Sequence, residues 1–205
     1  MKEHPIAFDA ESVRGTIDGI KTQTRRIIPQ RILDNDRCEV LPEENNIPHF
    51  FHATDCPDCC EYACGGYFFE EHPYTKGDRL WVKEALRPSA SGVTVYAADG
   101  TPVMVDGESF AWRWKSHRLW STFMPRVAAR ITLDVVRVRV ERIQDITLDE
   151  ANAEGGAGEA IVARWFRERW DSLNANRGYG WDKNPPVRVI QFRLVPKALL
   201  RSTRI

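Results

Sequence analysis

Alternation of apolar residues between positions 127 and 143 constrains the fold more than any other feature of the chain. The apolar side chains recur at every second position, in two sets that are out of phase: Ile131, Leu133 and Val135, then Val136, Val138 and Val140. A period of two predicts a β-strand with one buried face. The change of phase between Val135 and Val136 predicts a bulge or a bend. Charged residues at 137, 139 and 141 occupy the opposite face.

Helical signals follow this strand. Thr147 and Glu150 have the spacing of a capping box, so we expect a helix from Thr147 to about Glu154, ended by two glycines. A second helix is predicted over residues 158–173. Its apolar residues fall on one face of a helix: Val162, Phe166, Trp170 and Leu173.

The N-terminal part predicts a helix followed by a strand. Asp9 or Ser12 is expected to cap the helix, which Gly19 ends. Residues 24–28 favour extended backbone, so a strand is predicted there, and Pro29 ends it. Further strands are predicted at 6–8, 79–84, 93–97 and 187–195. This order of elements indicates an α+β fold with a small mixed or barrel-like sheet.

Length and charge limit the class of protein. The 205 residues suit a single domain, 1–205, with residues 30–76 as an insert within it. Lys+Arg and Asp+Glu both number 29, so net charge gives no argument for nucleic acid. Residues 113–142 are nevertheless locally basic, which favours phosphate binding or a solvated sheet face. The N-terminus has no secretory pattern and no stretch approaches a membrane span, so we expect a cytoplasmic protein without membrane contact.

The insert contains all five cysteines of the chain. Cys56 and Cys59 have the spacing with which two thiolates reach one tetrahedral zinc, and Cys64 is expected as a third ligand. We expect one structural zinc and no organic cofactor. The alternatives for the fourth ligand are Cys38, Cys60, His49 and His52. The competing interpretation is a set of free cytosolic thiols, because a second pair with this spacing is missing.

The hexamer KTQTRR, residues 21–26, holds the strongest candidates for chemistry. On a regular strand Lys21 and Thr24 point to opposite faces, whereas a turn after Gly19 brings them together. A threonine is a nucleophile only beside a base, and a lysine can be that base. Arg25 and Arg26 are suited to phosphate or an oxyanion. The alternative is an ordinary exposed polar strand.

Several segments together resemble the ASCH domain, a member of the PUA-like superfamily, in the form found in phages and prophages. They are G-x-K-T-x-T-R-R at 19–26, K-G-D-R-L-W-V-K-E at 76–84, M-P-R-x-A-A-R-I-T-L at 124–133, V-E-R-I-Q-D-I-T-x-D-E-A-x-A-E-G at 140–155, W-D-S-L-N at 170–174 and Y-G-W-D-x-N-P at 179–185. The resemblance covers most of the chain except the insert and parts of 85–123. It implies a small mixed β-barrel with flanking helices, and recognition of RNA or modified bases.

Around residues 21–26 the chain is similar to small amidohydrolases that remove the acetyl group from acetylcytidine. That similarity implies a base at Lys21, a nucleophile at Thr24 and a proton-transferring carboxylate at Glu154, with Glu150 as the alternative. It also implies that Arg26 stabilises negative charge. We add Arg25 and Trp81 as candidates for substrate binding, Trp81 by stacking on a base.

This chain departs from the small enzymes in three ways. It is about twice as long, it carries the cysteine insert, and it has Gln23 and Arg25 where they differ. Three alternatives to the hydrolase therefore stay open: a non-catalytic module that binds RNA or a modified base, a ribonuclease, and a structural phage protein. The expected partner is a nucleoside or RNA.

Overall fold

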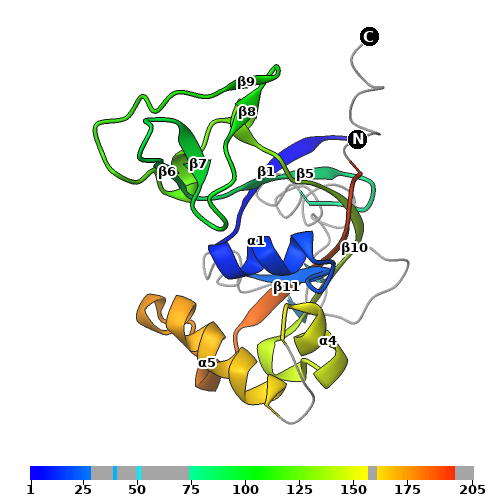
Figure 1. Cartoon of the computed structure of the whole chain (residues 1–205). Helices are drawn as coiled ribbons and strands as arrows, with labels where there is room; N and C mark the ends of the chain where they lie inside the picture. Colours follow the sequence, from blue (N-terminus) through cyan, green and yellow to red (C-terminus); the bar gives the residue numbers. More distant parts are fainter. Residues whose placement is uncertain (29–38, 41–49, 52–73, 157–160, 197–205) are drawn as a thin grey trace, which may run out of the picture. The chain divides into compact units, whose positions relative to one another are not determined.

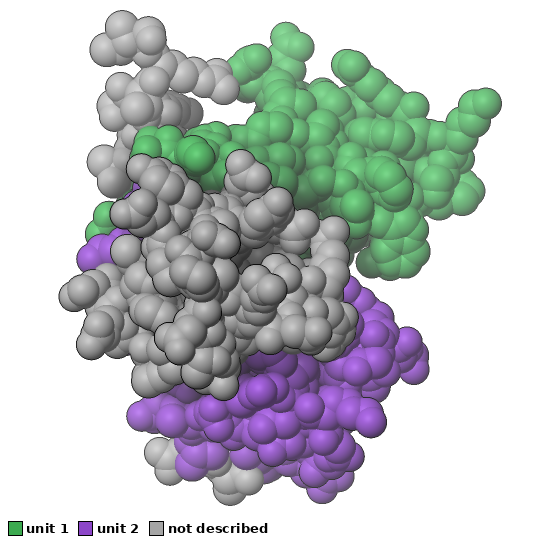
Figure 2. Space-filling view, turned by 180° about the vertical axis from the view of Figure 1, so that it is seen from behind, with its two compact units in different colours: residues 1–22, 78–134, 193–205 green, residues 23–77, 135–192 purple. Residues whose placement is uncertain are grey.

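The computed structural model describes residues 1–28, 39–40, 50–51, 74–156 and 161–196. The chain divides into two compact units, coloured separately in Figure 2. Unit 1 comprises residues 1–22, 78–134 and 193–205, and unit 2 comprises residues 23–77 and 135–192. Each unit is therefore built from segments that are far apart in the sequence.

Unit 1 is organised around three strands. Strand β1 (Glu3–Ala7) is parallel to β5 (Arg79–Lys83), and the first residues of β10 (Thr132–Arg142) are antiparallel to β5. Leu80 faces Leu133 across that pair, and both are buried. Helix α1 (Ala10–Ile17) follows β1 (Figure 1). Its N-cap is Asp9, whose carboxylate accepts a hydrogen bond from the backbone N–H of Ser12 at 2.9 Å, so Asp9 and not Ser12 caps the helix.

The remainder of unit 1 contains two small sheets. Strand β6 (Leu86–Pro88) pairs with β7 (Thr94–Tyr96), and β8 (Met104–Val105) pairs with β9 (Glu108–Ser109). Short 3-10 helices η1 and η2 cover Ser121–Phe123 and Arg126–Ala128. These elements share one apolar cluster: Leu86, Tyr96, Val103, Leu119, Met124 and Ala128.

Unit 2 packs two helices on one side of a pair of strands. Strand β2 (Gln23–Ile27) is antiparallel to β11 (Pro186–Leu194). Helices α4 (Leu148–Ala153) and α5 (Val162–Asn174) lie beside β11 in Figure 1. Their buried residues join those of the strands in one cluster: Ile143, Ala151, Val162, Phe166, Trp170, Val187 and Val189. This unit also holds β3 (Glu39–Val40), β4 (Phe50–Phe51) and the 3-10 helices η3 (Ile143–Asp145), η4 (Ala175–Arg177) and η5 (Trp181–Lys183).

The hydrogen-bonded order of the main strands is β1-β5-β10-β11-β2, and the chain segments of β10 and β11 belong in part to each unit. The parallel pair of β1 with β5 and the antiparallel pairs of β10 with β5 and of β11 with β2 make this a mixed sheet, which confirms the α+β prediction. No pairing of β1 with β2 occurs among the described residues. The strands of the described residues therefore form an open sheet and not the closed barrel that the resemblance implies.

A change of phase in β10 is present, but it falls later than predicted. Val135 and Val138 are buried, with 3% and 2% of their surface exposed, whereas Val136, which the prediction grouped with Val138, is 45% exposed. The strand itself begins later than predicted, because residues 126–128 form η2. The predicted face of α5 was wrong at one position: Leu173 is exposed and the neighbouring Asn174 is buried. Asn174 is accommodated there because its side-chain amide donates to the carbonyl of Trp170 at 3.1 Å.

Candidate functional site

Strand β2 carries most of the KTQTRR hexamer and presents it on two faces. The register with β11 runs without interruption from Gln23 to Ile27. Successive side chains of a regular strand point to opposite faces, so Gln23 and Arg25 share one face, while Thr24 and Arg26 share the other. We call these the Arg25 face and the Thr24 face.

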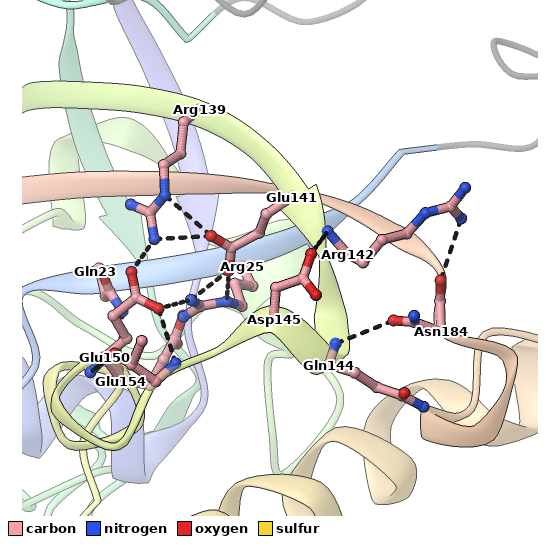
Figure 3. A network of polar contacts seen from close by, with 11 residues as sticks. Gln23, Arg25, Arg139, Glu141, Arg142, Gln144, Asp145, Glu150, Glu154 and Asn184 are labelled. Carbon is pink, nitrogen blue, oxygen red and sulfur yellow. Dashed lines mark hydrogen bonds and ion pairs between the residues drawn. The ribbon is translucent and has the colours of Figure 1, made fainter. Parts of the chain in front are cut away.

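Three carboxylates surround the buried guanidinium of Arg25 (Figure 3). Its Nε and Nη2 donate to Glu141 at 2.8 and 2.5 Å, and Nη2 also donates to Glu150 at 3.1 Å. Nη1 donates to Glu154 at 3.1 Å. Arg139 adds a second guanidinium, which pairs with Glu141 and Glu150. Two positive and three negative side chains thus form a charge-assisted network that ties α4 to β2 and β10.

The local sequence explains why these carboxylates are available. Glu150 is the third residue of α4 and completes its capping box: its carboxylate accepts from the N–H of Thr147, and the Thr147 hydroxyl accepts from the N–H of Glu150. Glu154 is the C-cap of the same helix, one turn later. The predicted capping box is therefore confirmed, and the four-residue spacing of Glu150 and Glu154 places both carboxylates on one side of α4. Gln23 donates to the carbonyl of Glu150 at 2.8 Å and adds a neutral contact.

The Thr24 face holds a different set of side chains. Thr24 is buried, with 5% of its surface exposed. Arg188 of β11 lies directly opposite Arg26, so the two guanidinium side chains start from neighbouring positions on one face. Burial lowers the pKa of Arg188 to about 10. Burial raises the pKa of Tyr74, although the charges of Arg26 and Arg188 act on it in the opposite direction. Tyr74 therefore lies within electrostatic reach of both arginines.

Lys21 is buried in unit 1, with 4% of its surface exposed. Its ammonium group lies 5.8 Å from the centre of the Phe8 ring, and its backbone N–H donates to the carbonyl of Gly15 at 2.8 Å. A Cβ at Gly15 would come to 3.4 Å from that of Lys21, so a small residue suits this position. The boundary between the units falls between Thr22 and Gln23, and Lys21 and Thr24 are thus described in different units.

Trp81, the candidate for stacking on a base, belongs to β5 in unit 1 and is half-buried. Two cations flank its ring: the ammonium of Lys83 at 5.6 Å and the guanidinium of Arg126 at 5.5 Å from the ring centre. Such contacts stabilise the ring in place and keep positive charge beside it. Its role in binding stays a prediction.

The structure brings some predicted site residues together and adds others. Arg25 and Glu154 are in direct contact, with the alternative carboxylate Glu150 beside them. Because Thr24 points to the other face of β2, these carboxylates do not share its side of the strand. The sequence places Arg139 and Glu141 only on a polar strand face, and it gives no prediction for Arg188 or Tyr74. The charge of Arg188 inside an apolar strand was the one available signal for that residue.

The predicted zinc ligands Cys38, Cys56, Cys59 and Cys64 lie outside the described residues, as do Cys60, His49 and His52. Within the part of the chain that the structure describes, no group of three or more His, Cys, Asp or Glu side chains is placed to hold a metal. The zinc site stays a prediction. Across the same described segments, no helix has the length and apolar character needed to cross a membrane.

Comparison with known proteins leaves the family open. No family model matches the chain, and no curated protein matches it. Among solved structures, it is similar to protein EF3133 from Enterococcus faecalis V583, a DUF984 protein, with 11% identity, a TM-score of 0.42, and coverage of 95% of this chain and 81% of that chain. It is also similar to an ASCH domain from Lactobacillus crispatus JV V101, with 9% identity, a TM-score of 0.43, and coverage of 94% and 79%. Both TM-scores are below 0.5.

Proposed function

We propose that this chain recognises a cytidine-type nucleoside, free or within RNA, through the Thr24 face of β2. The observation that carries the proposal is the burial of Thr24 on the same strand face as the arginine pair Arg26 and Arg188. The sequence resemblance to phage-type ASCH domains at residues 19–26 supports it independently.

The chemistry of these side chains suits the ligand. Guanidinium groups only donate hydrogen bonds, and the carbonyl oxygen and ring nitrogen of cytosine accept them. A threonine hydroxyl both donates and accepts, so it can contact either a carbonyl or an amino group of the base. A buried position strengthens such contacts, because water does not compete for the same groups.

Hydrolysis of an acylated cytidine is the reaction we propose for this site. In this scheme the Lys21 amine takes the proton of the Thr24 hydroxyl, whose oxygen attacks the amide carbonyl carbon. The carbon–nitrogen bond then breaks, the leaving amine takes up a proton, and cytidine departs. Water hydrolyses the resulting threonine ester and releases the acid. The resemblance, and not the geometry, assigns Lys21 to this reaction and assigns the proton transfers to Glu154.

The contact between Glu154 and Arg25 makes Glu154 the residue to test separately. A direct role in proton transfer requires that Glu154→Gln abolish turnover while the protein stays folded. A role in holding α4 to the sheet requires instead that the same variant lower the free energy of unfolding and leave turnover per folded molecule unchanged. Turnover and urea unfolding of one variant therefore separate the two roles.

Release of acetate and cytidine from acetylcytidine tests the proposed reaction, and equilibrium binding of cytidine tests recognition. Turnover by the wild type identifies a hydrolase. Binding without turnover supports the non-catalytic module. Cleavage that requires an RNA polymer, with no turnover of the nucleoside, supports the ribonuclease. Absence of both binding and turnover contradicts the proposal.

A further inference from the structure

We propose that unit 1 carries a surface that binds single-stranded nucleic acid, by stacking on its bases and by contacting its phosphates. We call it the aromatic-basic surface, and its residues are Trp81, Lys83, Arg118, Trp120, Phe123 and Arg126. They belong to strand β5, to the 3-10 helices η1 and η2, and to the segment that precedes η1. The inference goes beyond the proposed function, because the Thr24 face belongs to unit 2.

The first argument is the exposure of two aromatic rings in one turn. Of the aromatic residues whose side chains the structure describes, Trp120 and Phe123 are exposed, at 61% and 69%, and the others are buried or half-buried. The N–H of Phe123 donates to the carbonyl of Trp120 at 2.9 Å, so the two rings start from the ends of one tight turn. An exposed apolar patch bordered by polar residues is typical of an interaction surface.

Other aromatic residues of the same segment pack into unit 1. The ring centres of Trp112 and Trp114 are 4.9 Å apart, and those of Phe110 and Trp114 are 6.2 Å apart. All three rings pack against the apolar cluster of this unit. The segment therefore buries aromatic rings where they serve the core, and it leaves Trp120 and Phe123 in contact with water.

The second argument is that cations lie beside the rings. The guanidinium of Arg118 is 4.5 Å from the centre of the Trp120 ring. Lys83 and Arg126 flank the half-buried ring of Trp81 in the same way. A ring of this kind provides a surface on which a base can stack, and the cation beside it can contact the neighbouring phosphate.

Contacts between the elements join the two parts of the surface. Trp81 and Lys83 are two residues apart in β5, so they share its half-exposed face. The ammonium of Lys83 donates to the carbonyl of Thr122 in η1, the turn that carries the exposed rings. Arg126 extends from η2 to the ring of Trp81. The strand and both 3-10 helices therefore contribute to one continuous surface.

The third argument is the charge of this part of the chain. Residues 110–133 contain no Asp or Glu, and their cationic residues are Arg113, Lys115, Arg118, Arg126 and Arg130. Arg130 pairs with Glu84 and Asp99. Arg126 pairs with Glu3 at 3.0 Å, but both side chains are nearly half exposed, so the pair is weak and a phosphate can replace the carboxylate. The surface therefore attracts a polyanion.

Single-stranded nucleic acid matches this combination of rings and charges. Its bases are free to stack on protein rings, and its phosphates recur along the strand beside them. A duplex is a poorer match, because its bases are already stacked on one another. An apolar protein surface or a neutral membrane would cover the rings and leave the cations beside them without anions.

The test measures binding of an oligouridine of about 12 nucleotides to the full chain by fluorescence anisotropy, a length within the site sizes of such surfaces. The other probes are a deoxyuridine oligomer of the same length, a duplex of the oligouridine with oligoadenosine, and vesicles of phosphatidylcholine with phosphatidylglycerol. Oligouridine contains no cytosine, so its binding is tested separately from recognition of cytidine. Titration at several salt concentrations gives the salt dependence.

The variants remove one ring or one charge at a time. Trp120→Ala removes an exposed ring, Trp120→Phe replaces it by a smaller one, and Arg118→Gln removes the cation beside it. The matched controls lie on helix α5 in unit 2: Leu173→Ala at an exposed apolar residue, and Arg164→Gln at an exposed arginine. Thermal unfolding of each variant shows whether it is folded.

We expect the wild type and both controls to bind a single-stranded oligomer at least about tenfold more tightly than the duplex. Trp120→Ala should lower the affinity at least about fivefold, and Trp120→Phe should restore part of it. Arg118→Gln should lower the affinity and reduce the slope of log affinity against log salt by about 0.7, the value for one phosphate contact on a single strand. Binding of RNA, of DNA or of both supports the surface.

Four results would overturn the proposal: no binding of either single-stranded oligomer, equal affinity for the duplex, an affinity that Trp120→Ala leaves unchanged, or vesicle binding without oligomer binding. Self-association that Trp120→Ala abolishes, again without oligomer binding, would identify a contact between two copies of the chain instead. If oligouridine binds through Trp120 but cytidine does not bind, the proposed function fails and the aromatic-basic surface stands. If Trp120→Ala is unfolded, Phe123→Ala takes its place with the same expected results.

Discussion

The guanidinium of Arg25 and the carboxylate of Glu154 lie 3.1 Å apart, and both side chains are buried. This contact joins the strand that carries the KTQTRR hexamer to the C-cap of helix α4. It also directs Glu154 toward the Arg25 face of β2, opposite the Thr24 face. The same contact therefore bears on stability and on the assignment of chemical roles.

Replacement of Arg25 by methionine should destabilise the protein strongly. Three carboxylates would lose the guanidinium that they share, and removal of one partner from a buried ion pair typically costs about 3–5 kcal/mol. Urea unfolding measures the loss. The control is Arg167→Met, which removes an exposed pair with Asp182 and should cost less than about 1 kcal/mol. Similar losses in both variants would show that the Arg25 network does not stabilise unit 2.

Turnover of acetylcytidine should depend on Lys21 and Thr24. If the proposed reaction is correct, Lys21→Ala and Thr24→Val each lower kcat by a factor of about 100 or more, because one removes the base and the other the nucleophile. Thr24→Val keeps the shape of the buried side chain and limits the loss of packing. Thr122→Val, at an exposed threonine, is the matched control. Turnover that survives in both site variants rules out the assigned roles.

The stability of unit 1 should depend on pH through Glu84. Burial raises the pKa of this carboxyl above its ordinary value of 4.5, although Arg130 pairs with it at 2.8 Å and opposes the shift. A carboxyl with a raised pKa in the folded state binds its proton more tightly there than in the unfolded chain. Its contribution to the free energy of unfolding therefore decreases as the pH rises from about 4.5 through the folded-state pKa.

The measurement is urea unfolding over this pH range for the wild type and Glu84→Gln, which does not titrate. The unfolding free energy of the wild type, minus that of Glu84→Gln, should decrease as the pH rises. Glu108→Gln, at an exposed position of β9, should run parallel to the wild type. A difference that is independent of pH would show that Glu84 has the same pKa in the folded and unfolded states.

Zinc should accompany the purified protein at about one ion per chain, if the cysteines of the insert bind it as their spacing predicts. Elemental analysis measures the content, and Cys56→Ser or Cys59→Ser should reduce it. Because a structural zinc contributes to folding, a chelator should also lower the melting temperature of the wild type. Metal content well below one per chain in freshly purified protein would leave the cysteines as free thiols.

The sequence by itself determined those features that depend on residues close together in the chain. The Asp9 cap of α1 and the capping box of Thr147 and Glu150 are interactions between residues three apart, so their spacing alone predicts them. The strand 79–84 and the presence of a change of phase in β10 follow from local periodicity in the same way.

Only the tertiary structure decided which distant side chains meet. Arg188 lies opposite Arg26 because β11 pairs with β2 in one register, and a shift of one residue would move Arg188 to the other face. Glu154 meets Arg25 because α4 packs on that face of the strand. Composition and spacing do not encode these contacts, since each depends on the register and packing of segments more than 100 residues apart in the sequence.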